Sequence, residues 1–180
     1  MIRPEFRKIL LDQRGAAIIL WSFFVISIPV YIFISQKFVT APSPGASSFS
    51  YTLRIFVWLL TLVDLGYYVY WKKQNLSPDA ILASAKSAKL FRALADFQGE
   101  SEERAAFAVS TYVTRKVVVF AIIEAIAVYG FVLAFAGGFV ADQYLLSGLS
   151  VVLLVIEFPS EKSLDAIVKT AEQPASANDA

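Results

Sequence analysis

The sequence predicts an all-α integral membrane protein, a bundle of four transmembrane helices with a cytoplasmic amphipathic helix between the second and the third. The first observation behind this prediction is the composition. Of 180 residues, 57% are hydrophobic and only 17% are charged, and the mean hydropathy is +0.61. Soluble domains carry about a quarter charged residues. The second observation is that four stretches approach the ~20 apolar residues a helix needs to cross a bilayer.

The four predicted spans differ in how many charged residues interrupt them. The first carries none, the second contains Asp64 and, near one end, Arg54, and the third contains Glu124. The fourth has the shortest apolar stretch, because Asp142 and Glu157 lie near its two ends. The spans cover, in order, about residues 15–35, 51–71, 117–137 and 140–158. We predict one membrane domain over residues 1–172, followed by a disordered tail over residues 173–180.

The positions of Lys and Arg predict the orientation, because cytoplasmic loops of membrane proteins carry an excess of these residues. Basic residues concentrate in the N-terminal segment and between the second and third spans. The connection over residues 36–50 has only Lys37, and the turn over residues 137–144 has none. We therefore expect both termini and the central segment in the cytoplasm, and the protein in the cytoplasmic (inner) membrane.

The central segment, residues 77–115, is predicted to be helical. Ser77-Pro78-Asp79 is typical of a helix start, with a capping Ser, a Pro at the first position and an acid in the first turn. Apolar residues then recur at helical spacing through Phe97, and basic residues occupy the other face. Such a helix could lie on the membrane, dock a soluble partner, or pack as a connector on neighbouring helices.

Two further helices are expected outside the apolar stretches. Ser101 is a candidate N-terminal cap for a helix. No residue between Ser101 and Ala136 is expected to end that helix, so the third span is predicted to extend into the cytoplasm as one rod. Residues 160–173, SEKSLDAIVKTAEQ, have the pattern of a short amphipathic surface helix.

The absence of two residue types excludes most membrane-enzyme chemistry. The sequence has no His and no Cys, so imidazole-held haem, His or thiolate metal sites, and a His base for nucleophilic catalysis are excluded. No Gly-rich phosphate loop or nucleophile motif is present. The net charge of +1 gives no basic surface for a nucleic acid. We expect a protein that is not an enzyme and has no cofactor and no metal.

Glu124 and Asp64 are the candidate functional residues, because an acid inside a membrane-length helix is costly and usually functional. Each lies ~10–12 Å inside the predicted cytoplasmic interface at 1.5 Å per residue, on antiparallel helices. If they met, they would not both ionise and would share a proton. They could therefore bind a proton or Na⁺. Alternatively, each could be neutral and hydrogen-bonded across the bundle to Ser, Thr, Tyr or a backbone carbonyl.

Small residues recur three or four apart on the third span, where they permit close helix–helix approach in lipid. This face is expected to pack on another span or on another copy of the chain. Its residues are Ala127, Gly130, Ala134 and Gly137.

Residues 123–134, IEAIAVYGFVLA, resemble the ion-carrying helix of the proteolipid c subunits of rotary ATPases, in which a Glu is followed by small and aliphatic residues. Four-span versions of that family exist. The resemblance implies that Glu124 is a reversible proton or Na⁺ carrier in a ring, facing an arginine on a separate stator subunit. It covers these residues alone.

Two function hypotheses follow. The first is a non-catalytic inner-membrane protein, an accessory or scaffold subunit of a membrane assembly. The second is a proton- or Na⁺-translocating subunit that uses Glu124, with Asp64 as a helper. The expected partners are the lipid bilayer and either other membrane subunits or copies of the same chain.

Overall fold

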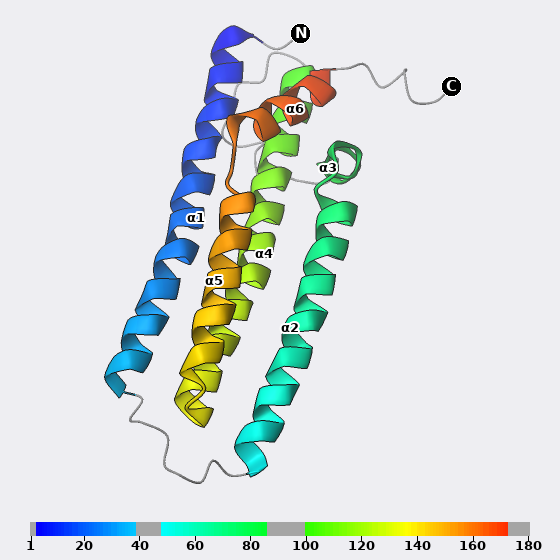
Figure 1. Cartoon of the computed structure of the whole chain (residues 1–180). Helices are drawn as coiled ribbons and strands as arrows, with labels where there is room; N and C mark the ends of the chain where they lie inside the picture. Colours follow the sequence, from blue (N-terminus) through cyan, green and yellow to red (C-terminus); the bar gives the residue numbers. More distant parts are fainter. Residues whose placement is uncertain (1–2, 39–47, 86–99, 173–180) are drawn as a thin grey trace. The chain divides into compact units, whose positions relative to one another are not determined.

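The protein is all-helical over the part of the chain that the structure describes. This computed structural model describes residues 3–38, 48–85 and 100–172, and every regular element in these ranges is an α-helix (Figure 1). The all-α prediction is therefore confirmed. The helices are α1 (Pro4–Phe38), α2 (Ser48–Asn75), α3 (Pro78–Ala85), α4 (Glu100–Gly137), α5 (Val140–Ile156) and α6 (Glu161–Glu172).

Three helices, α1, α2 and α4, are long and apolar enough to cross a membrane. The fourth predicted span corresponds to α5, which has only 17 residues and ends at Ile156. It meets the same criterion only together with α6, across the break at residues 157–160. The helix ends there because Pro159 lacks the N–H that would continue it. The chain thus has three to four candidate spans.

The long helices extend beyond the apolar stretches. α1 begins at Pro4, well before residue 15, and α4 runs without a break from Glu100 to Gly137. The predicted rod from Ser101 to Ala136 is therefore confirmed as one helix. The predicted helix through Phe97 is described only as α3, and its remainder lies outside the described residues, as does the predicted tail.

The chain divides into two compact units. Unit 1 comprises residues 1–19, 71–117 and 159–180, and unit 2 comprises residues 20–70 and 118–158. α1, α2 and α4 each contribute a segment to both units. Of the 16 Lys and Arg residues, all except Lys37 and Arg54 fall in the ranges of unit 1. The division thus follows the sequence contrast between basic and apolar segments.

Unit 1 has an ordinary apolar core, built from α1, α3, α4 and α6. The predicted surface helix of residues 160–173 is α6, and its apolar stripe is buried in this core. The helix and its amphipathic pattern are therefore confirmed, and the structure adds which helices cover the apolar stripe. The core includes Phe6, Leu10, Ile81, Ala105, Val109, Tyr112, Leu164, Ile167, Val168 and Ala171.

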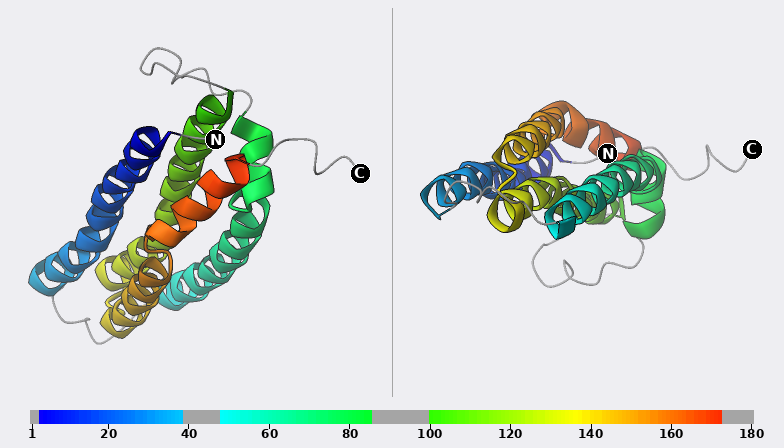
Figure 2. Two further views of the ribbon diagram at one scale, coloured as in Figure 1. Left: turned by 90° about the horizontal axis from the view of Figure 1, so that it is seen from above. Right: turned by 60° about the horizontal axis from the view of Figure 1, so that its bottom comes forward.

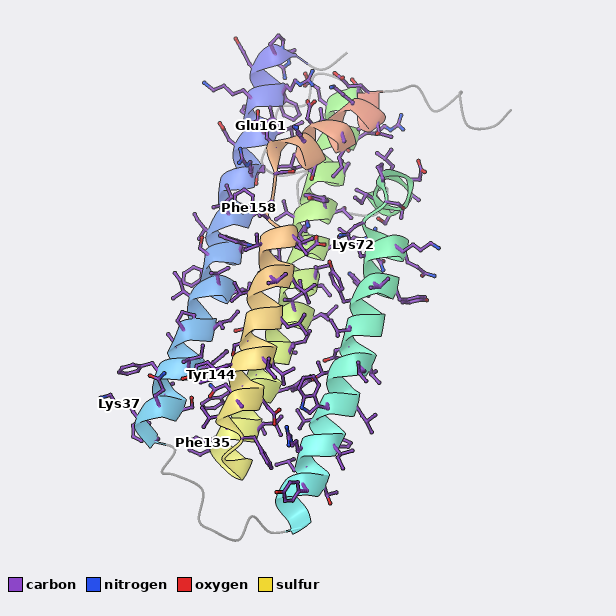
Figure 3. All side chains as sticks on the ribbon, viewed as in Figure 1. Lys37, Lys72, Phe135, Tyr144, Phe158 and Glu161 are labelled. Atoms are coloured by element: carbon purple, nitrogen blue, oxygen red, sulfur yellow. The ribbon has the colours of Figure 1, made fainter. Side chains whose placement is uncertain are left out.

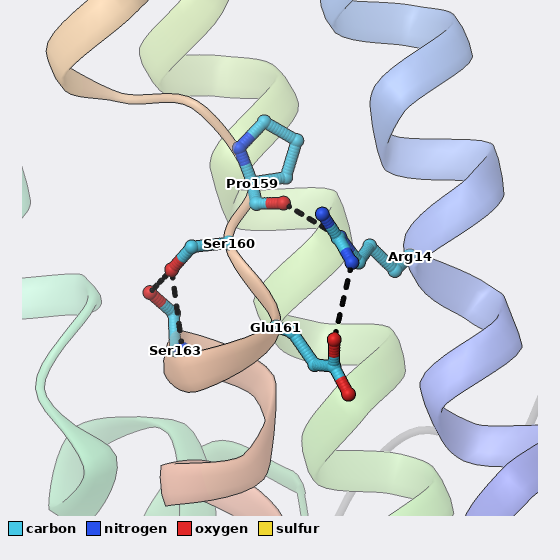
Figure 4. A network of polar contacts seen from close by, with 5 residues as sticks. All are labelled: Arg14, Pro159, Ser160, Glu161 and Ser163. Atoms are coloured by element: carbon cyan, nitrogen blue, oxygen red, sulfur yellow. Dashed lines mark hydrogen bonds and ion pairs between the residues drawn. The ribbon is translucent and has the colours of Figure 1, made fainter.

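Serine side chains cap the first turns of α3 and α6 in unit 1, and an arginine of α1 contacts the start of α6. The Ala80 N–H donates to Ser77 Oγ (3.3 Å), which confirms the predicted cap of α3. At α6, the Ser163 N–H donates to Ser160 Oγ over 3.3 Å (Figure 4). Arg14 of α1 joins this turn: its Nε donates to the Pro159 carbonyl at 3.1 Å, and its Nη1 lies 3.4 Å from a carboxylate oxygen of Glu161.

Unit 2 is a set of four helical segments in which α4 and α5 lie between α1 and α2 (Figures 1 and 2). The side-chain view places Lys37, Phe135 and Tyr144 near one end of this unit and Phe158 near the other (Figure 3). Many of its large apolar side chains are exposed, as in a helix surface that faces lipid. Examples are Phe23, Ile26, Phe33, Ile55, Leu59, Val63, Phe135, Leu145, Val152 and Ile156.

Candidate functional site

Glu124, on α4, is held by a tyrosine of α1. The Tyr31 hydroxyl donates to Glu124 Oε1 over 2.8 Å, and the Tyr31 ring packs on Phe131 with its centroid 5.7 Å away. The Glu124 side chain is half-buried. The cost of placing a carboxylate in an apolar segment is therefore offset by a specific contact between two helices, since intramembrane acids normally pair with groups in the bundle interior.

Asp64, on α2, has the same kind of partner on another helix. The Tyr129 hydroxyl of α4 donates to Asp64 Oδ2 over 2.7 Å. Tyr129 follows Glu124 by five residues, which turns it ~140° around the helix axis. α4 therefore directs Glu124 to α1 and Tyr129 to α2. The structure brings each predicted acid to its own tyrosine and does not bring the two acids together.

A third acid, Asp142, forms an ion pair that sequence reasoning missed. Two nitrogens of Arg54, on α2, contact its carboxylate. Nη2 donates to Oδ1 at 3.0 Å, and Nε lies 2.6 Å from Oδ2. The Asp142 side chain is 4% exposed and that of Arg54 is 43% exposed. The Arg54 guanidinium also lies 5.0 Å from the centroid of the Phe139 ring. The sequence places Arg54 and Asp142 near the same end of two predicted spans, but it does not show that these two helices are neighbours.

The fourth acid, Glu157, follows the last turn of α5. It accepts a hydrogen bond from the Tyr68 hydroxyl of α2 at 2.5 Å, and both side chains are buried. Tyr68 therefore lies between helices. Three of the four acids of unit 2 thus share one construction, a tyrosine of another helix that donates to a carboxylate.

A buried amide links α5 to α1. Gln143 is fully buried; its Nε2 donates to the backbone carbonyl of Tyr31 at 3.1 Å, and the Ser35 hydroxyl donates to its Oε1 at 2.5 Å. On the other side of α5, Ser150 donates to the Ile123 carbonyl of α4 over 2.9 Å. No sequence pattern had marked these residues, since a lone Gln and scattered Ser occur on most membrane helices.

The predicted small-residue stripe packs inside the chain. A Cβ on Gly130 would lie 3.1 Å from the Cα of Gln143 and 3.1 Å from the Cβ of Leu146. α4 and α5 therefore approach closely at Gly130, and Ala127 and Ala134 are fully buried beside it. Gly137 differs, because its nearest neighbour is the ring of Phe139 at the turn into α5.

The described residues contain no group of three or more acidic side chains that could hold a metal ion. The arrangement can accept a proton on any of its carboxylates and can hold helices together. No protein family, curated protein or solved structure matches this chain. The functional conclusion therefore rests on the geometry of unit 2.

Proposed function

We propose that the protein is a non-catalytic integral protein of the inner membrane that acts as an accessory or scaffold subunit of a membrane assembly. In this proposal α5 forms the fourth span, and both termini and the segment between α2 and α4 lie in the cytoplasm. One observation carries the proposal: every acid of unit 2 is bound to a side chain of a different helix. The polar groups in the apolar region serve helix–helix contacts.

The pairs join the four segments of unit 2 into a network. Glu124 joins α4 to α1, Asp64 joins α2 to α4, and Asp142 joins α5 to α2. Interhelical hydrogen bonds in membranes contribute about 0.6 kcal/mol each on average. A network of this kind favours one arrangement of helices whose apolar outer faces remain for lipid and for neighbouring subunits.

The absence of Cys makes the proposed topology directly testable. Lys37→Cys places a thiol near the proposed outer end of α1, and Lys72→Cys places one near the proposed inner end of α2. A membrane-impermeant maleimide should label the first variant in intact cells and the second only after permeabilisation. Labelling of both from outside would contradict the four-span arrangement with cytoplasmic termini.

The scaffold role is tested at Glu124 and Tyr31. Glu124→Gln keeps a side chain that can still accept from Tyr31, so the variant should retain helix packing and co-purifying membrane proteins. Glu124→Leu and Tyr31→Phe both lose the hydrogen bond and should release partners or lower thermal stability. The pull-down is done from native membranes in mild detergent. Equal partner recovery and stability in all three variants would contradict the proposal.

Ion translocation through Glu124 is the second candidate. It is supported by the partial exposure of Glu124, by the tyrosine hydroxyl as its one hydrogen-bond partner in the described ranges, and by the resemblance of residues 123–134 to proteolipid helices. Under this candidate, Glu124→Gln abolishes proton or Na⁺ flux in proteoliposomes while the fold persists. Asp64→Asn changes the proposed helper and should lower the flux less than Glu124→Gln does. If the unmodified chain and both variants show only the same background flux, ion translocation is contradicted and the scaffold role remains the proposal.

A further inference from the structure

α2 carries an open hollow on one face in unit 2. Its volume is about 400 Å³, within the range of about 300–1,000 Å³ typical of small-molecule sites. The lining residues repeat at helical spacing and so lie on one stripe of the helix. They are Tyr51, Arg54, Ile55, Trp58, Leu59 and Leu62.

The hollow is polar at one end and apolar along the rest. Asp142 engages Nε and Nη2 of Arg54, and Nη1 makes no hydrogen bond to the described residues. The guanidinium is thus fixed on one edge and available on the other. Beyond it, Ile55, Leu59 and Leu62 are 63%, 57% and 60% exposed. A ligand that fits this arrangement has an anionic oxygen group joined to an apolar chain.

The dimensions match one leaflet of a bilayer. Eight residues separate Arg54 from Leu62, which is ~12 Å along the helix. Half of the hydrocarbon core of a membrane is about 15 Å thick. An acyl chain that starts beside Arg54 would therefore follow the apolar stripe to near the middle of the bilayer.

We propose that this hollow binds a glycerophospholipid, whose phosphate accepts hydrogen bonds from Arg54 and whose acyl chain lies along Ile55, Leu59 and Leu62. Guanidinium groups bind phosphate through two parallel N–H bonds, which lysine cannot reproduce. Asp142 neutralises the charge of Arg54, so the phosphate itself is recognised rather than a net negative headgroup. Zwitterionic and anionic phospholipids should bind with similar affinity.

Native mass spectrometry of the detergent-purified full chain tests the proposal. Phosphatidylethanolamine and phosphatidylglycerol should each remain bound at a defined stoichiometry, and diacylglycerol with the same acyl chains should bind about tenfold more weakly, because it lacks the charge-assisted hydrogen bonds. Equal retention of diacylglycerol would overturn the proposal. Displacement of bound phospholipid by inorganic phosphate alone would also overturn it, since the site would then be an anion site.

Two variants and their controls locate the site. Leu59→Trp fills the hollow and leaves the Arg54–Asp142 pair intact, while Val152→Trp adds the same side chain to an exposed position of α5. The double variant Arg54→Gln, Asp142→Asn removes the guanidinium without leaving a buried acid unpaired, and Lys37→Gln removes an exposed cation elsewhere. Phospholipid retention should fall about tenfold in Leu59→Trp and in the double variant Arg54→Gln, Asp142→Asn. It should not change in Val152→Trp or in Lys37→Gln. Equal retention in all four proteins would show that lipid binds elsewhere.

Discussion

Unit 1 and unit 2 distribute apolar and charged side chains in opposite ways. Unit 1 buries its apolar side chains in one core and links its helices by ion pairs. Of the exposed large hydrophobic residues in the described ranges, only Ile9 and Ile19 belong to unit 1. Unit 2 exposes apolar side chains on its surface and places its acids between helices. The ion pairs of unit 1 include Arg3–Glu102, Arg7–Asp165, Lys169–Asp165 and Arg14–Glu161.

The contrast is the one expected if water surrounds unit 1 and lipid surrounds unit 2. In water, burial of apolar surface drives packing and exposed ion pairs add little. In lipid, the hydrophobic effect does not drive apolar side chains of two helices together. Close van der Waals packing and interhelical hydrogen bonds therefore determine the arrangement. A substitution that removes an interhelical polar contact in unit 2 should therefore be more costly than one that removes an exposed ion pair in unit 1.

The largest expected effect is the loss of Arg54. Arg54→Ala leaves the Asp142 carboxylate buried without its counter-charge, at a cost of about 3 kcal/mol. The matched change in unit 1 is Arg14→Ala, whose partner Glu161 is exposed. Thermal unfolding in detergent should show a large decrease for the first and little change for the second. The double variant Arg54→Met, Asp142→Asn should recover most of the loss, and a double variant as unstable as Arg54→Ala would contradict this account.

The next largest effect concerns the close approach of α4 and α5. Gly130→Leu forces a side chain against Gln143 and Leu146, and overpacking of this kind costs about 1–3 kcal/mol. Gly148→Leu is the control, because nothing lies within 4 Å of a Cβ at that glycine. The unfolding temperature should fall for the first variant only. Equal stability would mean that the stripe is not a packing surface within the chain.

A smaller effect is expected from each tyrosine–carboxylate pair. Tyr31→Phe and Tyr129→Phe each remove one interhelical hydrogen bond, which contributes about 0.6–1.7 kcal/mol in membrane proteins. In a double-mutant cycle, Tyr31→Phe should lose its effect when Glu124 is already Leu. Additive effects of the two changes would show that the hydroxyl and the carboxylate do not interact.

The smallest effect is a pH dependence in unit 1. Hydrogen bonds from Lys169 and Arg7 lower the pKa of Asp165 below its usual value. The stabilisation is complete above the usual pKa of an Asp, near 4, and is lost as the pH falls through the lowered pKa. Asp165→Asn should therefore be less stable than the unmodified chain at pH 7, and the difference should shrink on acidification. A difference that grows at low pH would reverse the assignment.

Local features of the fold could be predicted from sequence, because their causes are local. Ser77 caps α3 through the N–H three residues later, and α4 forms one helix because no Gly or Pro interrupts residues 100–129. The apolar stretches within α1, α2 and α4 mark these three helices as long and apolar enough to cross a membrane. The end of α5 before Pro159 has an equally local cause.

The partners within the candidate site could not be predicted in the same way. Glu124 and Asp64 were identified as costly acids, but their tyrosines depend on which face each helix turns to its neighbours. A five-residue separation on α4 sends Glu124 and Tyr129 to different helices, so equal depth did not bring the acids together. Arg54 and Asp142 are 88 positions apart, and only the packing of α2 beside α5 joins them.

The burial of α6 in the core of unit 1 has a consequence for biosynthesis. Phe6 and Leu10, near the start of the chain, pack in the same core as Leu164 and Val168, which follow every other helix. This core is therefore complete only after the ribosome has finished α6. Premature termination before residue 161 would leave the core without α6 and open to quality-control proteases, even where the earlier helices have already been inserted.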